Sequence, residues 1–199
     1  MHKTDYNFKA PALPYPPKEY DFGTFQQLNN VLRIYFNQLD RSLSLALSDG
    51  AYAAFSRTTD VTAALADTEY TIEYDDPTYI SGISKGTPAS RIVFEEGGQF
   101  LVSFTAQIYS TNASTVNFYF WPKINGADAD SGSAIKSSLK ANGDTMLVSR
   151  TSIFPIFAGD YLEVAWAVSS TDGSLDAASA TAFSPATPST TLSITRIAR

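Results

Sequence analysis

The chain has 199 residues, of which 44% are hydrophobic and 13% aromatic, so it can bury a core and is not disordered throughout. Its net charge of −6 disfavours binding to nucleic acid. The lack of cysteine excludes disulfides and thiol chemistry, and the single histidine, His2, leaves little scope for histidine-based catalysis. We therefore expect that the protein is not an enzyme. We also expect it to be rich in β-strands, because its 23 serines and 20 threonines suit exposed strands.

Residues 1–22 are rich in proline and aromatic residues. Closely spaced prolines block a helix and favour an extended chain, which can dock along a groove of another protein. A disordered tail is the alternative, because chain ends are often disordered. We predict that this arm binds another protein through Pro11, Pro14, Tyr15, Pro16, Pro17 and Tyr20.

Residues 23–50 are expected to form an amphipathic helix with Thr24 as its N-cap and Gly50 as its stop. Apolar residues recur there every three or four positions, which is typical of a coiled-coil seam, and the apolar face is broad enough for three helices around an axis. A helix packed on its own domain is the alternative. As a trimer stem, the helix would bring together Phe25, Leu28, Leu32, Phe36, Leu39 and Leu43.

Residues 51–90 are interpreted as a linker that carries the first strands, including an acidic stretch from Asp60 to Asp76. From residue 91 to 199 apolar and polar residues alternate, as in Phe100–Ile108, Val116–Trp121, Leu162–Val168 and Leu192–Ile194. A period of two is the signature of a strand. Turn signals such as Asn125-Gly126 separate these runs. The pattern predicts an antiparallel sandwich or barrel.

The chain carries none of the common catalytic or cofactor motifs, and we expect no cofactor and no metal. The segment Asp128–Gly132 resembles part of a calcium loop, but Leu139 stands where the closing glutamate would be. No apolar run is long enough to span a membrane. Tyr119 and Trp121 share one face of a strand whose other face is also aromatic, so a second cover is needed. We expect a neighbouring subunit to supply it, which adds both residues to the predicted trimer interface.

The order of strands and turns resembles the trimeric jelly roll of the tumour-necrosis-factor and complement-head type, in its versions on tailed-phage virions. The residues that carry this resemblance are Arg91–Phe94, Gly98–Phe104, Trp121–Gly126, Phe157–Val164 and Leu192–Ile197. The opening Leu13–Tyr20 and the helix segment Tyr35–Gln38 are similar to those of cyanophage virion proteins.

The resemblance implies a homotrimeric structural protein of a phage virion, a decoration or head-fibre protein made in the host cytoplasm. Its partners would be capsid or tail proteins of the same particle, which the N-terminal arm would bind. The alternative is the tip of a tail fibre that binds a receptor or a host surface glycan. For that function the candidate loops are 126–133, 140–144 and 170–189.

Overall fold

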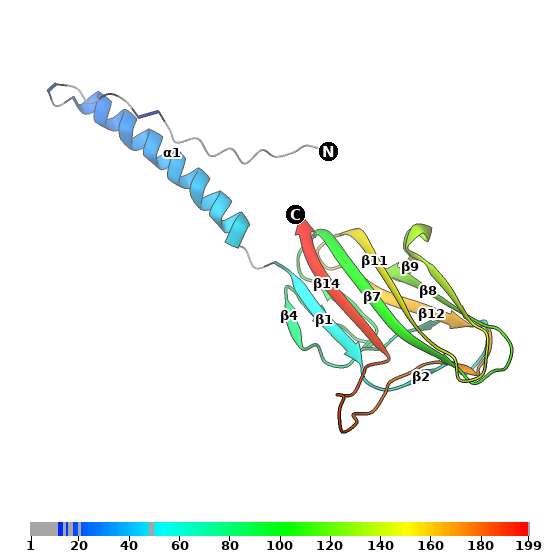
Figure 1. The fold of residues 1–199 in the computed structure, drawn as a ribbon. Helices are drawn as coiled ribbons and strands as arrows, with labels where there is room; N and C mark the ends of the chain where they lie inside the picture. The colour runs from blue at the N-terminus through cyan, green and yellow to red at the C-terminus, as the bar shows by residue number, and fades with distance from the viewer. Residues whose placement is uncertain (1–11, 14, 16–17, 20, 48–49, 199) are drawn as a thin grey trace. The chain divides into compact units, whose positions relative to one another are not determined.

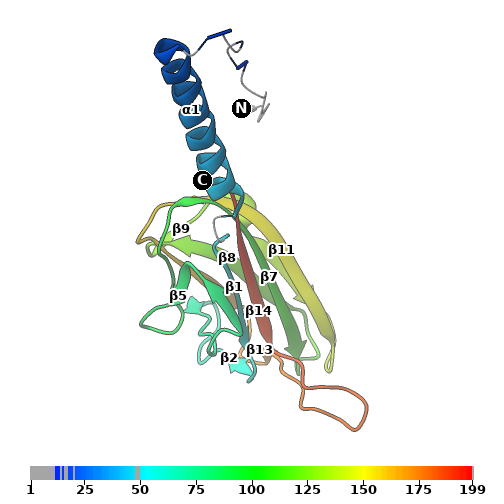
Figure 2. The same cartoon turned by 90° about the vertical axis from the view of Figure 1, so that its left-hand side faces the viewer.

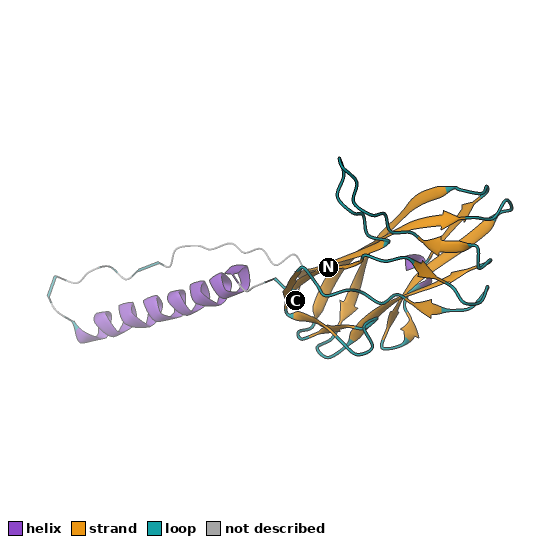
Figure 3. Ribbon diagram, turned by 90° about the horizontal axis from the view of Figure 1, so that it is seen from below, coloured by secondary structure: helices purple, strands orange, loops and turns teal. Residues whose placement is uncertain are grey.

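The structure is a computed structural model that describes residues 12, 13, 15, 18, 19, 21–47 and 50–198. The chain forms two compact units, Met1–Ser48 and Asp49–Arg199. The described part of the first unit is helical, whereas the second consists mostly of strands (Figure 3). The two expected kinds of structure therefore occur in two separate parts of the chain.

The helix α1 spans Phe22–Leu47, close to the predicted range. Its first turn is capped by Asp21 rather than by Thr24. The backbone N–H groups of Gly23 and Thr24 donate to the Asp21 carboxylate at 3.2 and 2.9 Å, and the Thr24 hydroxyl donates to it at 2.6 Å. The hydrogen bonds from Thr24 and Gly23 stabilise the charged carboxylate and lower the pKa of Asp21. The prediction of Thr24 as N-cap was wrong because a carboxylate three residues earlier accepts these donors.

The strands form two antiparallel sheets of seven strands each (Figure 1). Sheet A consists of β1 (Tyr52–Arg57), β2 (Val61–Thr62), β4 (Tyr79–Ser81), β7 (Gly98–Ser110), β11 (Thr145–Ile156), β13 (Gly173–Leu175) and β14 (Thr190–Ala198). Sheet B consists of β3 (Tyr70–Thr71), β5 (Ile83–Lys85), β6 (Ile92–Phe94), β8 (Val116–Ile124), β9 (Ala127–Asp128), β10 (Ile135–Leu139) and β12 (Tyr161–Val168). A short 3-10 helix, η1 (Ser131–Ser133), precedes β10.

The connections make the sandwich a jelly roll. In sheet A, β7 pairs with β11 on one side and with β14 and β13 on the other, and β14 continues to β1 and β4 (Figure 2). In sheet B, the order is β10, β8, β12, β6 and β5. The chain crosses between the sheets from β6 to β7, β7 to β8, β10 to β11 and β11 to β12. Residues 51–90 contribute β1 to β5 to these sheets, so the compact unit begins well before residue 91.

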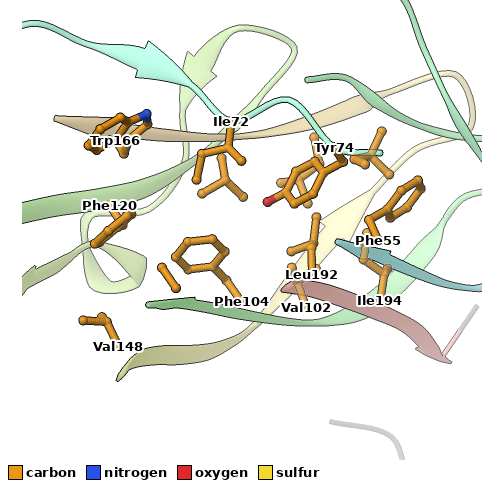
Figure 4. Close-up of a cluster of buried hydrophobic side chains, with 14 of the residues drawn as sticks. Phe55, Ile72, Tyr74, Val102, Phe104, Phe120, Val148, Trp166, Leu192 and Ile194 are labelled. Carbon is orange, nitrogen blue, oxygen red and sulfur yellow. The ribbon is translucent and has the colours of Figure 1, made fainter. Parts of the chain in front are cut away.

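The core lies between the sheets, where the inward-facing halves of the alternating strands meet (Figure 4). The alternation in β7 is confirmed, because Phe100, Ala106 and Ile108 are each 0% exposed and the residues between them are not buried. In β12 both faces are buried from Leu162 to Trp166. Aromatic pairs connect the sheets, with ring centroids 4.6 Å apart for Phe94–Phe100 and 5.3 Å for Phe104–Phe120. Burying this many large apolar side chains is the main stabilising contribution to the sandwich.

Two glycines stand where the chain needs a tight turn or a close approach. Asn125 and Gly126 have φ values of 52° and 78°, which suits the tight turn predicted between β8 and β9. Gly173 begins β13 where a Cβ would lie 2.6 Å from Val168 and 2.7 Å from Phe118, so only glycine allows this close approach.

The start of β1 and the end of β14 lie at one end of the sandwich, and the loop before β14 projects from the other (Figures 1 and 2).

Candidate interaction surfaces

The described part of the N-terminal unit exposes large apolar side chains. Tyr15 is 96% exposed, and Phe25 and Phe36 of α1 are 51% and 58% exposed. Leu28, Leu32 and Leu39 are half-buried within this unit, and the side chain of Leu43 lies outside the described residues. The remaining predicted anchor residues also lie outside the described residues: Pro11, Pro14, Pro16, Pro17 and Tyr20.

The outer face of sheet A is built from hydroxyl and apolar side chains. The register of the ladders places Leu101, Ser103 and Thr105 of β7 on the same face as their partners in the neighbouring strands. Over the described strands β4, β1, β14, β7 and β11, this face carries no Asp, Glu, Lys, Arg or His. Its members are Tyr52, Ala54, Ser56, Tyr79, Ser81, Gln99, Leu101, Ser103, Thr105, Gln107, Tyr109, Thr145, Leu147, Ser149, Thr151, Ile153, Pro155, Thr191, Ser193 and Thr195. We call this surface the uncharged face.

Four hydroxyl groups at the centre of the uncharged face are paired with one another. Ser103 and Thr151 share a hydrogen bond of 2.5 Å across β7 and β11, and the Thr105 hydroxyl donates to the Ser149 oxygen at 3.3 Å. Apolar side chains flank these pairs, with Leu147 65% and Ile153 55% exposed. Because paired hydroxyls lose less on desolvation than free ones, another protein surface can cover this part of the face at low cost.

The outer face of sheet B differs, because it combines aromatic and charged side chains. Tyr119 and Trp121 project from β8 on this face and are both half-buried. The Trp121 indole N–H donates to Asp128 Oδ1 at 2.9 Å, and the Lys136 ammonium lies 5.5 Å from the centroid of the Tyr119 ring. We predicted from the sequence that a neighbouring subunit covers Tyr119 and Trp121. In the structure, β9 and β10 of the same chain already cover part of both side chains.

An ion cluster lies beside these aromatic residues. The Lys123 ammonium donates to Glu69 and lies 3.6 Å from Asp128 Oδ1. The hydrogen bond to Glu69, which outweighs partial desolvation, raises the pKa of Lys123. Across the ladder from Lys123, the buried Glu163 accepts a hydrogen bond of 2.7 Å from the Ser90 hydroxyl. These partners fix the charged part of sheet B in one arrangement.

A groove of about 690 Å³ opens on the outer face of sheet B. Tyr119, Trp121 and three small residues line it together with charged side chains from three parts of the chain. Asp67, which lies before β3, has a φ of 51°, a conformation that Asp adopts more readily than most residues. The full lining is Asp67, Tyr119, Phe120, Trp121, Asp128, Ala129, Asp130, Ala134, Ile135, Lys136 and Ala167.

Sequence reasoning found part of these surfaces and missed the rest. Tyr119 and Trp121 were singled out by their shared parity, and the loop 126–133 supplies Asp128 and Asp130 to the groove. The contribution of Asp67 was missed because it lies more than 50 residues earlier in the chain. The uncharged face was also missed, since its residues come from separate strands whose neighbours only the register reveals.

The described residues contain no group of three or more His, Cys, Asp or Glu side chains arranged to hold a metal ion. Within the same ranges, α1 lacks the combination of length and hydropathy that a membrane-spanning helix requires.

The fold is an antiparallel jelly-roll sandwich that follows a separate N-terminal helix. No family model and no curated protein match this sequence. Among solved structures, the chain is similar to the globular domain of zebrafish complement 1qA protein, with a TM-score of 0.45 and 10% identity over 76% of this chain and 99% of that chain. It is also similar to Eiger TNF from S. frugiperda, with a TM-score of 0.48 and 12% identity over 74% of this chain and 92% of that chain. These similarities concern the backbone fold alone.

Proposed function

We propose that this chain is a non-enzymatic, homotrimeric structural protein of a virus particle of the tailed-phage type. In this proposal the jelly roll is a knob, α1 is part of a three-helix stem, and the N-terminal arm attaches the trimer to capsid or tail proteins. The link to phage particles rests on the sequence resemblance of the opening and the strand segments. The proposal that copies associate rests on the surfaces described above.

The observation that carries the proposed self-association is the uncharged face of sheet A. A surface without ionic groups can be buried against a copy of itself without leaving any charge unpaired. Leu101, Leu147 and Ile153 give it apolar contact area, and the paired hydroxyls between them are already satisfied. A hollow of about 730 Å³ adjoins Leu101 and Ile153 at the β11 edge, but Asp130 and Arg150 also line it, so we leave it outside the proposed contact. We therefore propose the knob contact on this face and not at Tyr119 and Trp121, because Asp128 and Lys136 of the same chain already contact those two residues.

The exposed side chains of α1 support the proposed stem. Phe25 and Phe36 expose about half of their surface, and they belong to the apolar series with coiled-coil spacing. A helix with such a face gains most of its stability from packing against another surface. Three copies around one axis would cover this face, with Leu28, Leu32 and Leu39 completing the seam.

Trimerisation would also explain how a short arm can hold a particle partner. Each arm contributes few contacts, but three arms on one trimer bind with a high effective concentration after the first has bound. Tyr15 and Leu13, which are 96% and 53% exposed, are available for such contacts.

The molar mass in solution tests the proposed assembly. Light scattering on the purified full chain is expected to give three times the chain mass of 21.6 kDa, whereas a value of 21.6 kDa would contradict it. Deletion of residues 1–22 tests the arm separately. The shortened protein should still form trimers but should be absent from purified particles, and its presence there at the level of the full chain would overturn the anchoring function.

A further inference from the structure

We propose that the groove on the outer face of sheet B binds an oligosaccharide that is neutral or carries amino groups. The groove is formed within one chain and holds about 690 Å³, which is within the usual size range of ligand sites. It does not depend on the trimer, on the stem or on attachment to a particle. The nature of its lining identifies the class of ligand.

The aromatic wall of the groove suits the apolar C–H face of a sugar ring. Trp121 and Tyr119 are two residues apart on β8, so their rings stand next to each other on one face of the sheet. The hydrogen bond from the indole N–H to Asp128 holds Trp121 in place, which lowers the entropy lost when a ligand packs on it. The face of an aromatic ring attracts positively polarised groups, such as the C–H groups of a sugar and the Lys136 ammonium that lies 5.5 Å from the Tyr119 ring centroid.

Carboxylates around the aromatic wall supply acceptors for sugar hydroxyls. Asp67, Asp128 and Asp130 reach the groove from the segment before β3 and from the β9 region. An ionised carboxylate offers about four acceptor positions, so Asp128 can accept further bonds in addition to the one from Trp121. A few convergent polar groups beside an apolar wall are the usual means by which a pocket orients a polar ligand.

The charge balance of the groove selects among sugars. Three aspartates and a single lysine line it, so its field is negative. Uronate or sialic acid groups would be repelled, whereas an amino group would be attracted. Ala129, Ala134 and Ala167 are the small residues of the lining, and they leave space where longer side chains would fill the groove.

The test measures binding of the unmodified full chain to an array of neutral, amino-bearing and acidic oligosaccharides, followed by titration calorimetry with the best ligand. We expect binding to neutral or amino-bearing sugars and none to acidic ones. Trp121→Ala should weaken binding at least tenfold, and Trp121→Phe should restore most of it. Phe157→Ala is the matched control, because Phe157 is 76% exposed after β11 and does not line the groove, and it should bind like the unmodified chain.

Two further variants keep the proposal falsifiable if Trp121→Ala fails to fold. Ala134 is exposed, so Ala134→Trp should fill the groove without disturbing the core and should abolish binding. Asp67→Asn keeps a residue that tolerates its φ of 51° and should reduce the preference for amino-bearing over neutral sugars several-fold. Absence of binding, preference for acidic sugars, or full binding by Ala134→Trp would overturn the proposal. Because the molar mass is measured separately, failure here leaves the proposed trimer untouched.

Discussion

The two outer faces of the sandwich have the same alternating strand pattern but different polar residues. The face of sheet A, over its described strands, presents Ser, Thr and apolar side chains without a charge, whereas that of sheet B carries Tyr119, Trp121, Lys123 and Lys136 beside several carboxylates. Both faces cover the same core (Figure 4). Alternation therefore determines which half of a strand faces the core, while the chemistry of the other half determines what the outer face can bind.

The largest effect should come from placing a charge on the uncharged face. Ser193 is exposed on β14, opposite Ser103 and Ala54, so Ser193→Arg puts an unpaired cation at the centre of the face. Burying such a charge costs several kcal/mol, so we expect the molar mass to fall from three chains to one. Light scattering checks this.

The matched control for Ser193→Arg is Thr71→Arg, since Thr71 is exposed and pairs with Ala165 on sheet B. We expect Thr71→Arg to keep the mass of the unmodified protein. If both variants dissociate, or neither does, the two faces do not differ in the way proposed.

A smaller effect should separate the faces by their response to salt. Surface electrostatics are screened within roughly 3 Å at 1 M salt and about 30 Å at 0.01 M. Self-association through the uncharged face should therefore change little over this range, because the face lacks charges among its described residues. Binding of an amino-bearing oligosaccharide to the groove should weaken several-fold, and binding of a neutral one should not. Light scattering measures the molar mass and calorimetry measures sugar binding at both salt concentrations. A molar mass that depends strongly on salt would argue against self-association through the uncharged face.

The smallest effect concerns Asp75, which joins the segment after β3 to the end of β1. Its backbone N–H donates to Ser56 of β1 at 2.8 Å, and its carboxylate accepts hydrogen bonds of 2.8 and 2.6 Å from the N–H and hydroxyl of Thr58. Partial desolvation acts to raise the pKa of Asp75, but the bonds from Thr58 and the nearby charges of Arg57 and Lys85 together lower it. The charged carboxylate therefore stabilises the fold above its ordinary pKa of 3.8, and this stabilisation is lost as the pH falls through the lowered value.

We expect Asp75→Asn to lower the melting temperature at pH 7 by about 1–3 °C, because the site is partly exposed and its electrostatics are screened. The difference in melting temperature between the unmodified protein and Asp75→Asn should disappear below the lowered pKa of Asp75. Thermal melts from pH 7 to pH 2 measure it. The molar mass and sugar binding should stay unchanged at pH 7, since Asp75 lies on neither face. A difference that grows towards acid pH would contradict the assignment.

The long strands could be predicted from the sequence because each buries one full apolar half. Phe100, Val102 and Phe104 in β7 and Leu192 and Ile194 in β14 are buried as the period of two requires. The early strands could not be placed in the same way. β2, β3, β4 and β5 have only two or three residues each, which is too short to show a period.

The surfaces required knowledge of the pairing between strands. Trp121 was recognised from its own strand, but the groove around it also needs Asp67, which a local pattern cannot bring near. Ser103 and Thr151 look like ordinary polar positions until the ladder of β7 and β11 places them side by side. Sequence periodicity thus finds the inside of a sandwich more readily than it finds what its outside can do.

The polypeptide begins and ends its sandwich at one end, where Tyr52 pairs with Thr195, and the bridge between Ala178 and Thr187 closes a loop at the other end. Phe183 near the tip of this loop is almost fully exposed, and most residues around it are exposed as well. Foreign sequence inserted there would extend away from the start of β1, from the end of β14 and from the strands of the core. The loop is therefore the place at which this scaffold can be made to display an epitope or a tag.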